Sequence, residues 1–335
     1  MNLIRKILFP LVPIYQGVTW IRNWCFDKHI FKSKSYNFPI ICVGNLSVGG
    51  TGKTPLIEYL VRLLKDNYSI ATLSRGYKRN TKGFQIANEN SSALTVGDEP
   101  YQFYQKFTDI VVSVDSDRQY GIAMLQRIKN KPDIILLDDA FQHRKVKAGF
   151  NILLTTYDRL YINDFSLPTG NLREPKSGAK RADVIVVTKC PNFLSNDEKN
   201  KIINLLKPKD KQQVFFSTIN YADTIYSIKE SKPIGILKNE QFTLVTGIAN
   251  SESLLNYLKE QGCNFEHLKF KDHHEFTTAD LGKVNGKELV LTTEKDFMRL
   301  KGKIDTSRIY YLPIDVEISN EDKFNTIVKQ FISSY

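Results

Sequence analysis

A glycine-rich segment at residues 47–54 ends in a lysine and a threonine and reads Ser-Val-Gly-Gly-Thr-Gly-Lys-Thr. Glycines let the backbone bend so that successive N–H groups point at one centre, where an anion is bound. A lysine after such a turn reaches the β- and γ-phosphates of a nucleotide, and the next hydroxyl ligates Mg²⁺. The sequence therefore predicts a nucleotide phosphate site at Ser47, Val48, Gly49, Gly50, Thr51, Gly52, Lys53 and Thr54.

The segments on either side of these residues support the same interpretation. The apolar run 40–43 precedes them and predicts a buried strand, and apolar residues recur at helical spacing over residues 56–64. Strand, glycine-rich turn and helix in this order form a P-loop. The general pattern has glycine where this chain has Ser47, and the alternative is a turn that only connects strand and helix. The Gly-Lys-Thr register at residues 52–54 favours nucleotide binding.

A second apolar run, at residues 134–137, ends in the adjacent acids Asp138 and Asp139. A hydrophobic strand that ends in aspartate is typical of a Walker B element, whose carboxylate holds Mg²⁺. Two adjacent carboxylates repel each other unless a cation lies near, which favours a metal site over an exposed turn. We therefore expect Thr54, Asp138 and Asp139 to hold Mg²⁺.

Two other segments carry polar side chains suited to binding a substrate. Gln142 and His143 follow the acidic pair directly, where an amide and an imidazole could recognise a polar ligand. Arg173 and Glu174 lie in a loop stiffened by prolines at 168 and 175. They could clamp a phosphate and hydroxyl groups, or form a simple surface ion pair.

Asp98 stands at the start of a predicted helix, where it is either an N-cap or a general base beside the phosphates. The only histidine pair is His273 and His274. Adjacent histidines on an extended chain point in opposite directions and chelate poorly, so a single histidine acting as a catalytic partner is the better interpretation. Pro191 occupies the place of the aspartate in the guanine-reading motif Asn-Lys-x-Asp, so that ATP is favoured over GTP.

The arrangement of apolar runs predicts an α/β fold: a doubly wound, mostly parallel sheet of the P-loop NTPase class with a second, smaller α/β domain. We expect the P-loop kinase core at 29–225, the smaller domain at 226–318, and a C-terminal helix at 319–335 that returns to the core. Strands are predicted at 40–43, 70–73, 110–114, 134–137, 152–154, 184–187, 242–245, 289–291 and 309–312.

Residues 1–28 are predicted to form a helix that lies in a membrane interface. The segment is rich in aliphatic and aromatic residues with Arg5, Lys6 and Arg22 at its edges, and Pro10 and Pro13 interrupt the run. The alternative is a helix that packs on the protein's own core. The net charge of +11 indicates an anionic partner, but no zinc finger or RNP-type strand motif is present, so nucleic acid is not expected. Four scattered cysteines indicate a reducing compartment.

Taken together, these motifs resemble the signature of the tetraacyldisaccharide 4′-kinase family, the lipid A 4′-kinases of Gram-negative bacteria. Ser or Thr is usual in that family at the place of Ser47. The segments that carry the resemblance follow the family's order and are 43–55, 73–77, 97–100, 138–143, 168–170, 172–174, 272–273 and 293–296.

The resemblance implies transfer of the γ-phosphate of ATP to the 4′-hydroxyl of a tetraacylated glucosamine disaccharide 1-phosphate, giving lipid IVA. It implies that Asp98 is the base, that His273 is its partner and that Lys53 serves the phosphates. It also implies a lipid substrate and a peripheral location on the cytoplasmic face of the inner membrane. The candidates for substrate or phosphate contacts are Arg75, Tyr77, Gln142, His143, Arg173 and Glu174.

Two other classes of protein share some of these features. A regulatory or metal-insertion P-loop NTPase would need a base-reading motif and usually a Cys/His metal relay, and the sequence contains neither. A non-catalytic membrane adaptor would have no use for the acidic motifs. The sequence therefore favours the kinase.

Overall fold

The computed structural model describes residues 5, 7–272 and 274–335. Its larger lobe is built on a nine-stranded sheet with the order β15-β8-β7-β6-β1-β5-β2-β4-β3. All neighbours from β8 to β4 are parallel, and the edge strands β15 and β3 run antiparallel to their neighbours. The strands are β1 (Ile40–Asn45), β2 (Ile70–Ser74), β3 (Gln85–Ile86), β4 (Val111–Val114), β5 (Ile134–Asp138), β6 (Phe150–Thr156), β7 (Val184–Thr188), β8 (Gln213–Tyr221) and β15 (Ile314–Ile318).

Helices cover both faces of this sheet, because successive residues of a strand point to opposite faces. Ile41 and Val43 of β1 pack in the core beneath α3, α5 and α11, whereas Ile40 and Cys42 pack in the core beneath α6 and α7. The predicted doubly wound, mostly parallel α/β sheet is therefore confirmed. The helices of this lobe are α3 (Lys53–Leu64), α4 (Ala93–Val96), α5 (Asp98–Lys106), α6 (Arg118–Leu125), α7 (Asn196–Leu206) and α11 (Glu321–Ser333).

The smaller lobe has its own six-stranded sheet, with the order β10-β9-β14-β13-β11-β12. Its core gathers residues such as Leu244, Leu258 and Leu291. The elements are β9 (Thr224–Tyr226), β10 (Ser231–Pro233), β11 (Phe242–Thr246), α8 (Glu252–Glu260), β12 (Phe265–Lys269), α9 (Thr278–Asn285), β13 (Val290–Thr293), α10 (Glu294–Leu300) and β14 (Ile309–Leu312).

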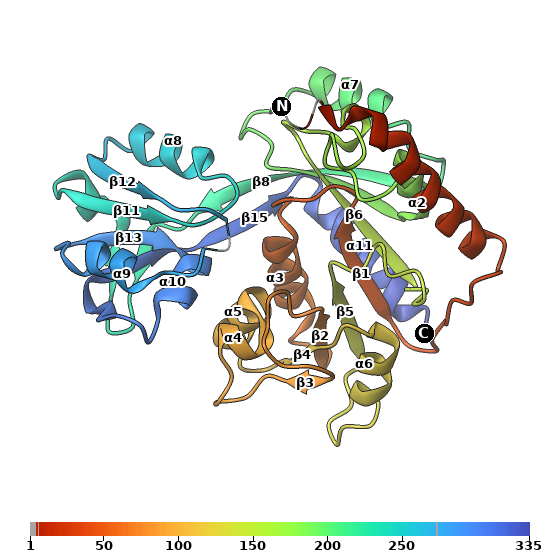
Figure 1. Cartoon of the computed structure of the whole chain (residues 1–335), viewed down its shortest axis with the longest axis horizontal. Coiled ribbons are helices and arrows are strands. Elements are labelled where there is room, and N and C mark those ends of the chain that lie inside the picture. Colours follow the sequence, from red (N-terminus) through yellow and green to blue (C-terminus); the bar gives the residue numbers. More distant parts are fainter. Residues whose placement is uncertain (1–4, 6, 273) are drawn as a thin grey trace.

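Two long antiparallel strands join the lobes, and Figure 1 shows β8 and β15 running side by side from one lobe to the other. Their pairing extends from Tyr221 and Ile314 at one end to Ser217 and Ile318 at the other. The strands of the smaller sheet span residues 224–312, and the predicted boundary at residue 318 falls at the end of β15. After β15 the chain forms α11, whose Phe324 and Val328 lie in the core of the larger lobe.

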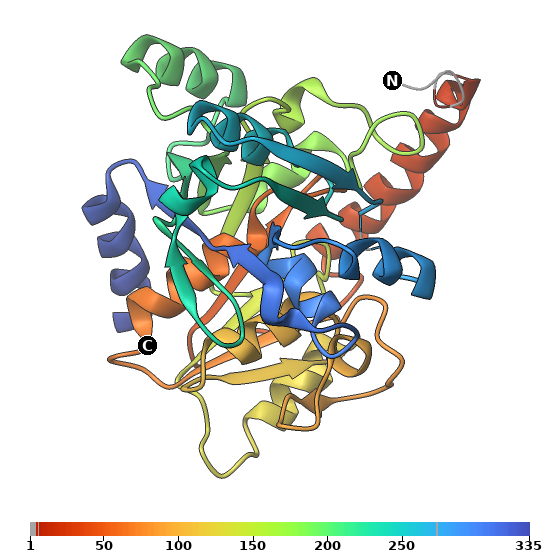
Figure 2. The same cartoon turned by 90° about the vertical axis from the view of Figure 1, so that its left-hand side faces the viewer.

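The N-terminal segment forms the 3₁₀ helix η1 (Phe9–Leu11) and then α2 (Val12–Asp27), with proline in the first turn of each. Figure 2 shows these helices at the outer margin of the molecule (red). Only Val12, Asn23 and Phe26 of α2 are buried. Shorter 3₁₀ helices complete the chain: η2 (Tyr161–Asn163), η3 (Lys176–Arg181), η4 (Ile234–Lys238) and η5 (Thr306–Arg308).

Candidate active site

The P-loop connects β1 to α3 at the carboxyl edge of the larger sheet, as the sequence predicts. Gly52 takes a φ of 87°, a left-handed conformation that favours glycine, and α3 begins at the next residue. The unpaired N–H groups of a first helical turn are a ready anion site. Two side chains hold the loop from below: Asn45 Nδ2 donates to Thr51 Oγ1 at 2.7 Å, and Thr188 Oγ1 donates to the Thr51 carbonyl at 2.8 Å.

Asp139 turns its carboxylate toward the P-loop lysine. It follows the end of β5 with a φ of 48°, and its Oδ1 lies 3.5 Å from Lys53 Nζ. Arg173 binds the same carboxylate with both terminal nitrogens, at 2.7 and 2.9 Å. Burial raises the pKa of Asp139, but Lys53 and Arg173 outweigh it and hold the pKa below its usual range. Asp139 is therefore a permanent anion between two cations.

Asp138 is buried at the end of β5. There it pairs in register with Val43 of β1, the strand that precedes the P-loop. Its Oδ2 accepts a hydrogen bond from Ser74 Oγ at 3.2 Å, while its Oδ1 has no hydrogen-bond partner within the described part of the chain. Burial, and after it the nearby charge of Glu99, raise the pKa of Asp138 to about 7. An orphaned buried carboxylate oxygen is the donor that a hard cation needs.

The donor set fits Mg²⁺ better than a transition metal. The described residues contain no cluster of three or more His, Cys, Asp or Glu side chains that would form a closed metal cage. Mg²⁺ in nucleotide sites uses one or two carboxylates together with substrate phosphates and water. Thr54 on α3 and the acidic pair after β5 are the oxygen ligands that such a site would use.

Asp98, the first residue of α5, is held by the smaller lobe. Its Oδ2 accepts hydrogen bonds from Arg299 Nε at 2.9 Å and Arg299 Nη2 at 2.7 Å. Arg299 also donates to Asp296 Oδ1, so a buried cation of α10 fixes the predicted base. The predicted partner His273 lies outside the described residues. His274 is engaged elsewhere: its Nε2 lies 2.9 Å from Asp280 Oδ2 on α9.

The loop after β2 packs against the start of α5. A Cβ placed on Gly97 would lie 3.2 Å from the Cα of Gly76, and both glycines have positive φ angles. This close approach brings the predicted substrate residues Arg75 and Tyr77 next to Asp98. Both side chains are exposed, with Tyr77 62% exposed.

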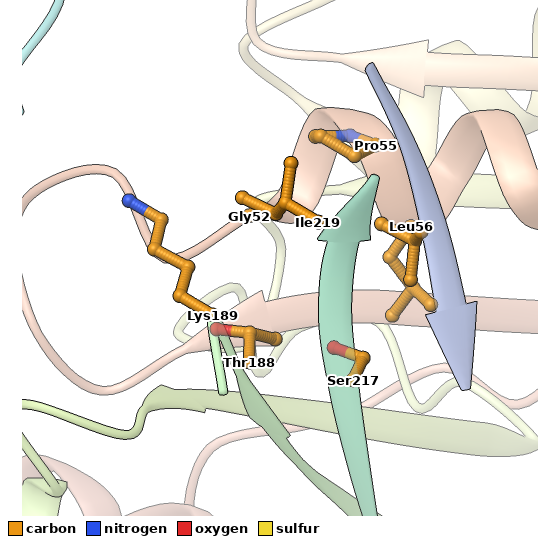
Figure 3. A pocket seen from close by; sticks show the side chains of 8 residues that line it. Gly52, Pro55, Leu56, Thr188, Lys189, Ser217 and Ile219 are labelled. Carbon is orange, nitrogen blue, oxygen red and sulfur yellow. The ribbon is translucent and has the colours of Figure 1, made fainter. Parts of the chain in front are cut away.

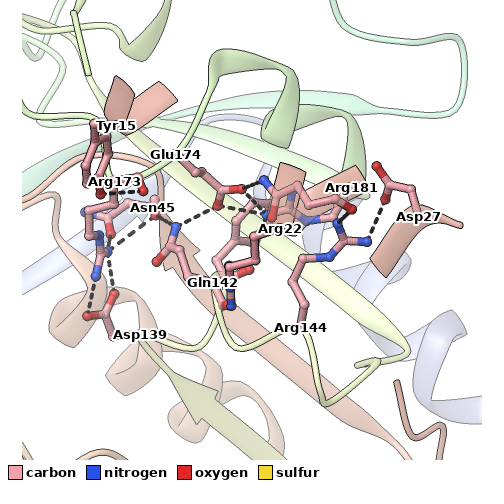
Figure 4. A network of polar contacts seen from close by, with 12 residues as sticks. Tyr15, Arg22, Asp27, Asn45, Asp139, Gln142, Arg144, Arg173, Glu174 and Arg181 are labelled. Carbon is pink, nitrogen blue, oxygen red and sulfur yellow. Dashed lines mark hydrogen bonds and ion pairs between the residues drawn. The ribbon is translucent and has the colours of Figure 1, made fainter. Parts of the chain in front are cut away.

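Glu174 lies inside the protein, and Figure 4 shows its network. The residue is 1% exposed, and its carboxylate binds Arg181 with both oxygens, at 2.8 and 2.9 Å. Gln142 Nε2 donates to Glu174 Oε1 at 2.9 Å, and Asn23 Nδ2 donates to Oε2 at 2.8 Å. The structure thus places Glu174 in a buried polar cluster with the partly buried Gln142 and Arg181.

His143 follows Gln142 and is partly buried. Burial, and after it the charge of Arg118, lower the pKa of His143 to about 4. The imidazole is therefore neutral near pH 7. Its Nε2 has no hydrogen-bond partner among the described residues.

A pocket lies at the base of the P-loop, between the start of α3 and the strands that join the lobes (Figure 3). Lys189 follows β7, and its Nζ lies 4.0 Å from the position that a Cβ on Gly50 would occupy. Burial lowers the pKa of Lys189. The Cβ of Ala249, from the smaller lobe, lies 3.8 Å from the same position. The pocket is lined by Gly52, Pro55, Leu56, Thr188, Lys189, Ser217, Ile219 and Val316.

The structure brings the P-loop, the acidic pair and Arg173 together, and it places Asp98 on the side that faces the smaller lobe. Several residues that hold these groups belong to no motif with a predicted role. Nothing in the local sequence marks Asn23 or Arg181, whereas Asn45 lies within the P-loop segment 43–55. Arg299 follows the Thr-Glu-Lys-Asp motif at 293–296 on the same helix, which was a usable signal.

The outer face of the N-terminal helices is apolar. No helix in the described part of the chain is long and apolar enough to span a membrane. Arg22 turns inward instead of edging this face, because its Nη2 donates to the Gln142 carbonyl at 2.7 Å. Phe165, from the loop after β6, joins the apolar face through an edge-on contact with Phe9. The exposed apolar residues are Ile7, Phe9, Leu11, Ile14, Val18, Trp20, Ile21, Trp24 and Phe165.

Comparisons with known proteins identify the family of this chain. A family model described as tetraacyldisaccharide-1-P 4′-kinase matches residues 4–333. A tetraacyldisaccharide 4′-kinase of Flavobacterium johnsoniae is 53% identical over 99% of this chain and 98% of its own length. One of Bacteroides fragilis is 44% identical over 96% and 92%. The crystal structure of LpxK from Aquifex aeolicus in complex with ATP matches with a TM-score of 0.79 and 32% identity, over 98% of this chain and all of that one.

These matches cover nearly the whole chain, and they confirm the predicted fold class and the prediction of ATP as a ligand. The chain belongs to the tetraacyldisaccharide-1-P 4′-kinase family, and it is an ATP-dependent kinase of lipid A biosynthesis.

Proposed function

We propose that the site transfers the γ-phosphate of ATP to the 4′-hydroxyl of a tetraacylated glucosamine disaccharide 1-phosphate and yields lipid IVA. The observation that carries the proposal is the grouping of Lys53, Asp138, Asp139 and Arg173 around the P-loop, beside a helix with an exposed apolar face. A regulatory or metal-insertion NTPase would have no use for an acceptor site next to such a face.

The phosphates of ATP bind to the backbone N–H groups of the P-loop, and Lys53 neutralises charge on the transferring phosphoryl group. The orphaned Oδ1 of Asp138, with Asp139 and Thr54, would hold Mg²⁺, which would neutralise phosphate charge when bound. Lys189 lies beside Gly50 and adds a second ammonium group near the nucleotide.

Asp98 removes the proton from the 4′-hydroxyl while that oxygen attacks the γ-phosphorus and ADP leaves. Arg299 holds the Asp98 carboxylate in place through two hydrogen bonds. His273 is the proposed catalytic partner of Asp98. A positioned base of this kind contributes about 100- to 10,000-fold to a rate. Since Arg299 comes from the smaller lobe, contact between the two lobes fixes the position of Asp98.

The acceptor lipid approaches over the rim formed by Arg75 and Tyr77, with His143 and Arg173 deeper in the site. Asp139 positions the Arg173 guanidinium for the phosphate, and Gln142 donates a hydrogen bond to Glu174, the residue that follows Arg173. The protein works at the cytoplasmic face of the inner membrane, as a peripheral protein. There the exposed face of η1 and α2 inserts into the interface, and the net charge of +11 favours an anionic surface.

The experiment that tests this function is phosphate transfer from γ-labelled ATP to the acceptor lipid in detergent micelles. We expect a labelled lipid with Mg²⁺ and none after chelation. An acceptor whose 4′-hydroxyl is already phosphorylated should remain unlabelled. Label that appears only as free inorganic phosphate, with both acceptors, would contradict a kinase and support an NTPase.

A further inference from the structure

The helix α2 has two faces with different partners. Its exposed face is apolar, as described above, but the opposite face carries polar side chains that turn toward the larger lobe (Figure 4). Asn23 is 8% exposed although it is polar and lies on a surface helix. A helix that served only as an anchor would need apolar residues on that face, because buried polar groups are costly unless they are hydrogen-bonded.

The partners of this polar face belong to the active-site loops. Tyr15 Oη donates to the carbonyl of Arg173 at 2.9 Å. Asn23 Nδ2 donates to Oε2 of the next residue, Glu174, at 2.8 Å. The helix therefore holds two consecutive residues at two points, one on the main chain and one on a buried carboxylate.

Glu174 fixes this attachment firmly. Its two oxygens together accept four hydrogen bonds, from Asn23, from Gln142 and twice from Arg181. A buried carboxylate with all its partners in place cannot shift without leaving a charge unpaired, which is strongly unfavourable. The peptide that links Arg173 to Glu174 is thus immobilised relative to α2.

The side chain of Arg173 points the other way, into the phosphate site. It binds both oxygens of Asp139 and also contacts Asn45, which in turn holds Thr51 of the P-loop. Asp139 Oδ1 lies 3.5 Å from Lys53 Nζ. A continuous series of contacts therefore leads from α2 through residues 173 and 174 to the lysine of the P-loop.

We infer that Tyr15 and Asn23 are positioning residues for phosphate transfer: through Arg173 and Glu174, α2 sets the placement of Asp139 and Lys53. The inference rests on the proposed function and adds that the membrane-facing helix is also a structural part of the catalytic site. The two faces of α2 then have separable effects. The polar face governs the rate of transfer, and the apolar face governs encounter with the lipid.

The test compares four full-length proteins in detergent micelles, where attachment to a bilayer plays no part: wild type, Tyr15→Phe, Asn23→Ala, and a control on the apolar face, Val18→Asn. Loss of an outer-shell contact that orients an active-site group typically lowers activity about 10- to 100-fold. We expect kcat to fall about 10-fold in Tyr15→Phe and further in Asn23→Ala, with the KM for ATP unchanged. Val18→Asn should keep its kcat and bind phospholipid vesicles more weakly than wild type.

Tyr15→Phe removes one hydroxyl group and leaves the ring, so it keeps the test valid even if Asn23→Ala does not fold. Thermal unfolding of each variant checks the fold. If wild type labels no lipid, the proposed function fails. If wild type labels lipid while Tyr15→Phe keeps a normal kcat, only the positioning role of α2 is overturned.

Discussion

The phosphate-binding loop and the groups around it are built in different ways. The P-loop is one continuous segment, and its glycine conformation and the start of α3 create the anion site from the backbone. The surrounding groups are each held by a residue far away in the chain. Arg299 holds Asp98, Arg173 holds Asp139, and Asn23 holds Glu174.

This difference separates two kinds of mutational effect. A substitution in the P-loop removes a group that touches the nucleotide itself. A substitution in a remote residue leaves every chemical group present but lets it move, since orientation depends on contacts that the remote residue supplies. The site is therefore only partly preformed by local sequence, and both lobes and the N-terminal helix contribute to its geometry.

The largest effect is expected at the local part of the site. Lys53→Ala removes the cation that stabilises the transferring phosphoryl group, and kcat should fall at least about 100-fold. Lipid phosphorylation at saturating ATP is the measurement. A folded Lys53→Ala protein with nearly normal turnover would contradict the assignment of the P-loop.

The proposed base and its partner provide the next comparison. Asp98→Ala and His273→Ala should each lower kcat about 100-fold. The kcat of the double variant should be only slightly lower than that of the less active single variant, because the effects of residues that act as a unit are not additive. A kinetic double-mutant cycle measures this. Losses that multiply independently would show that the two residues do not form a dyad.

Asp138 allows a test based on pH. Its pKa is raised to about 7 in the folded protein, above the unfolded value of about 3.9, because burial disfavours the charge. The folded state therefore binds the proton more tightly, so the stability that this group contributes at low pH is lost as pH rises through 7.

Asp138→Asn keeps the shape without the charge. Without metal or nucleotide, its free energy of unfolding relative to wild type should increase from about pH 5 to about pH 8. Urea unfolding at both pH values measures this difference. The contributions of the other titratable groups cancel in it, because both proteins share those groups. A constant difference would mean that the Asp138 carboxyl titrates normally.

The smallest effect is expected at the outer face of α2. Replacing Trp20 and Trp24 by serine removes exposed apolar area, and vesicle binding should weaken at least about 3-fold while kcat in micelles is retained. High salt should release part of the wild-type protein, because salt screens attraction to anionic lipid. Resistance of wild type to both salt and alkaline carbonate would indicate an integral anchor.

The sequence predicted the parts of the molecule in which nearby residues determine the structure. The P-loop and the acidic end of β5 were recognised because strand, turn and helix follow one another directly. Strands such as β12 and β15 were not predicted, because their charged and half-exposed residues give no continuous apolar run. Glu174 was interpreted as a clamp for substrate or as a surface ion pair, and it is buried.

The residues that hold the site escaped prediction for a related reason. Asn23 and Arg181 both bind Glu174. Asn23 lies 151 residues away from it in the sequence, and Arg181 lies 7 residues away. No periodicity or spacing encodes such a meeting. Glu174 shows the consequence: its neighbours in the sequence indicate a polar loop, but only the packing of α2 against that loop buries the carboxylate.

In the proposed reaction, the γ-phosphate of ATP is transferred to a lipid hydroxyl and not to water. The most direct measurement uses ATP labelled with ¹⁸O in its γ-phosphate, followed by tandem mass spectrometry of the acceptor lipid. We predict a product with one labelled phosphate at the 4′ position of the non-reducing glucosamine. Label found only in inorganic phosphate, with the disaccharide lipid unchanged, would contradict the account.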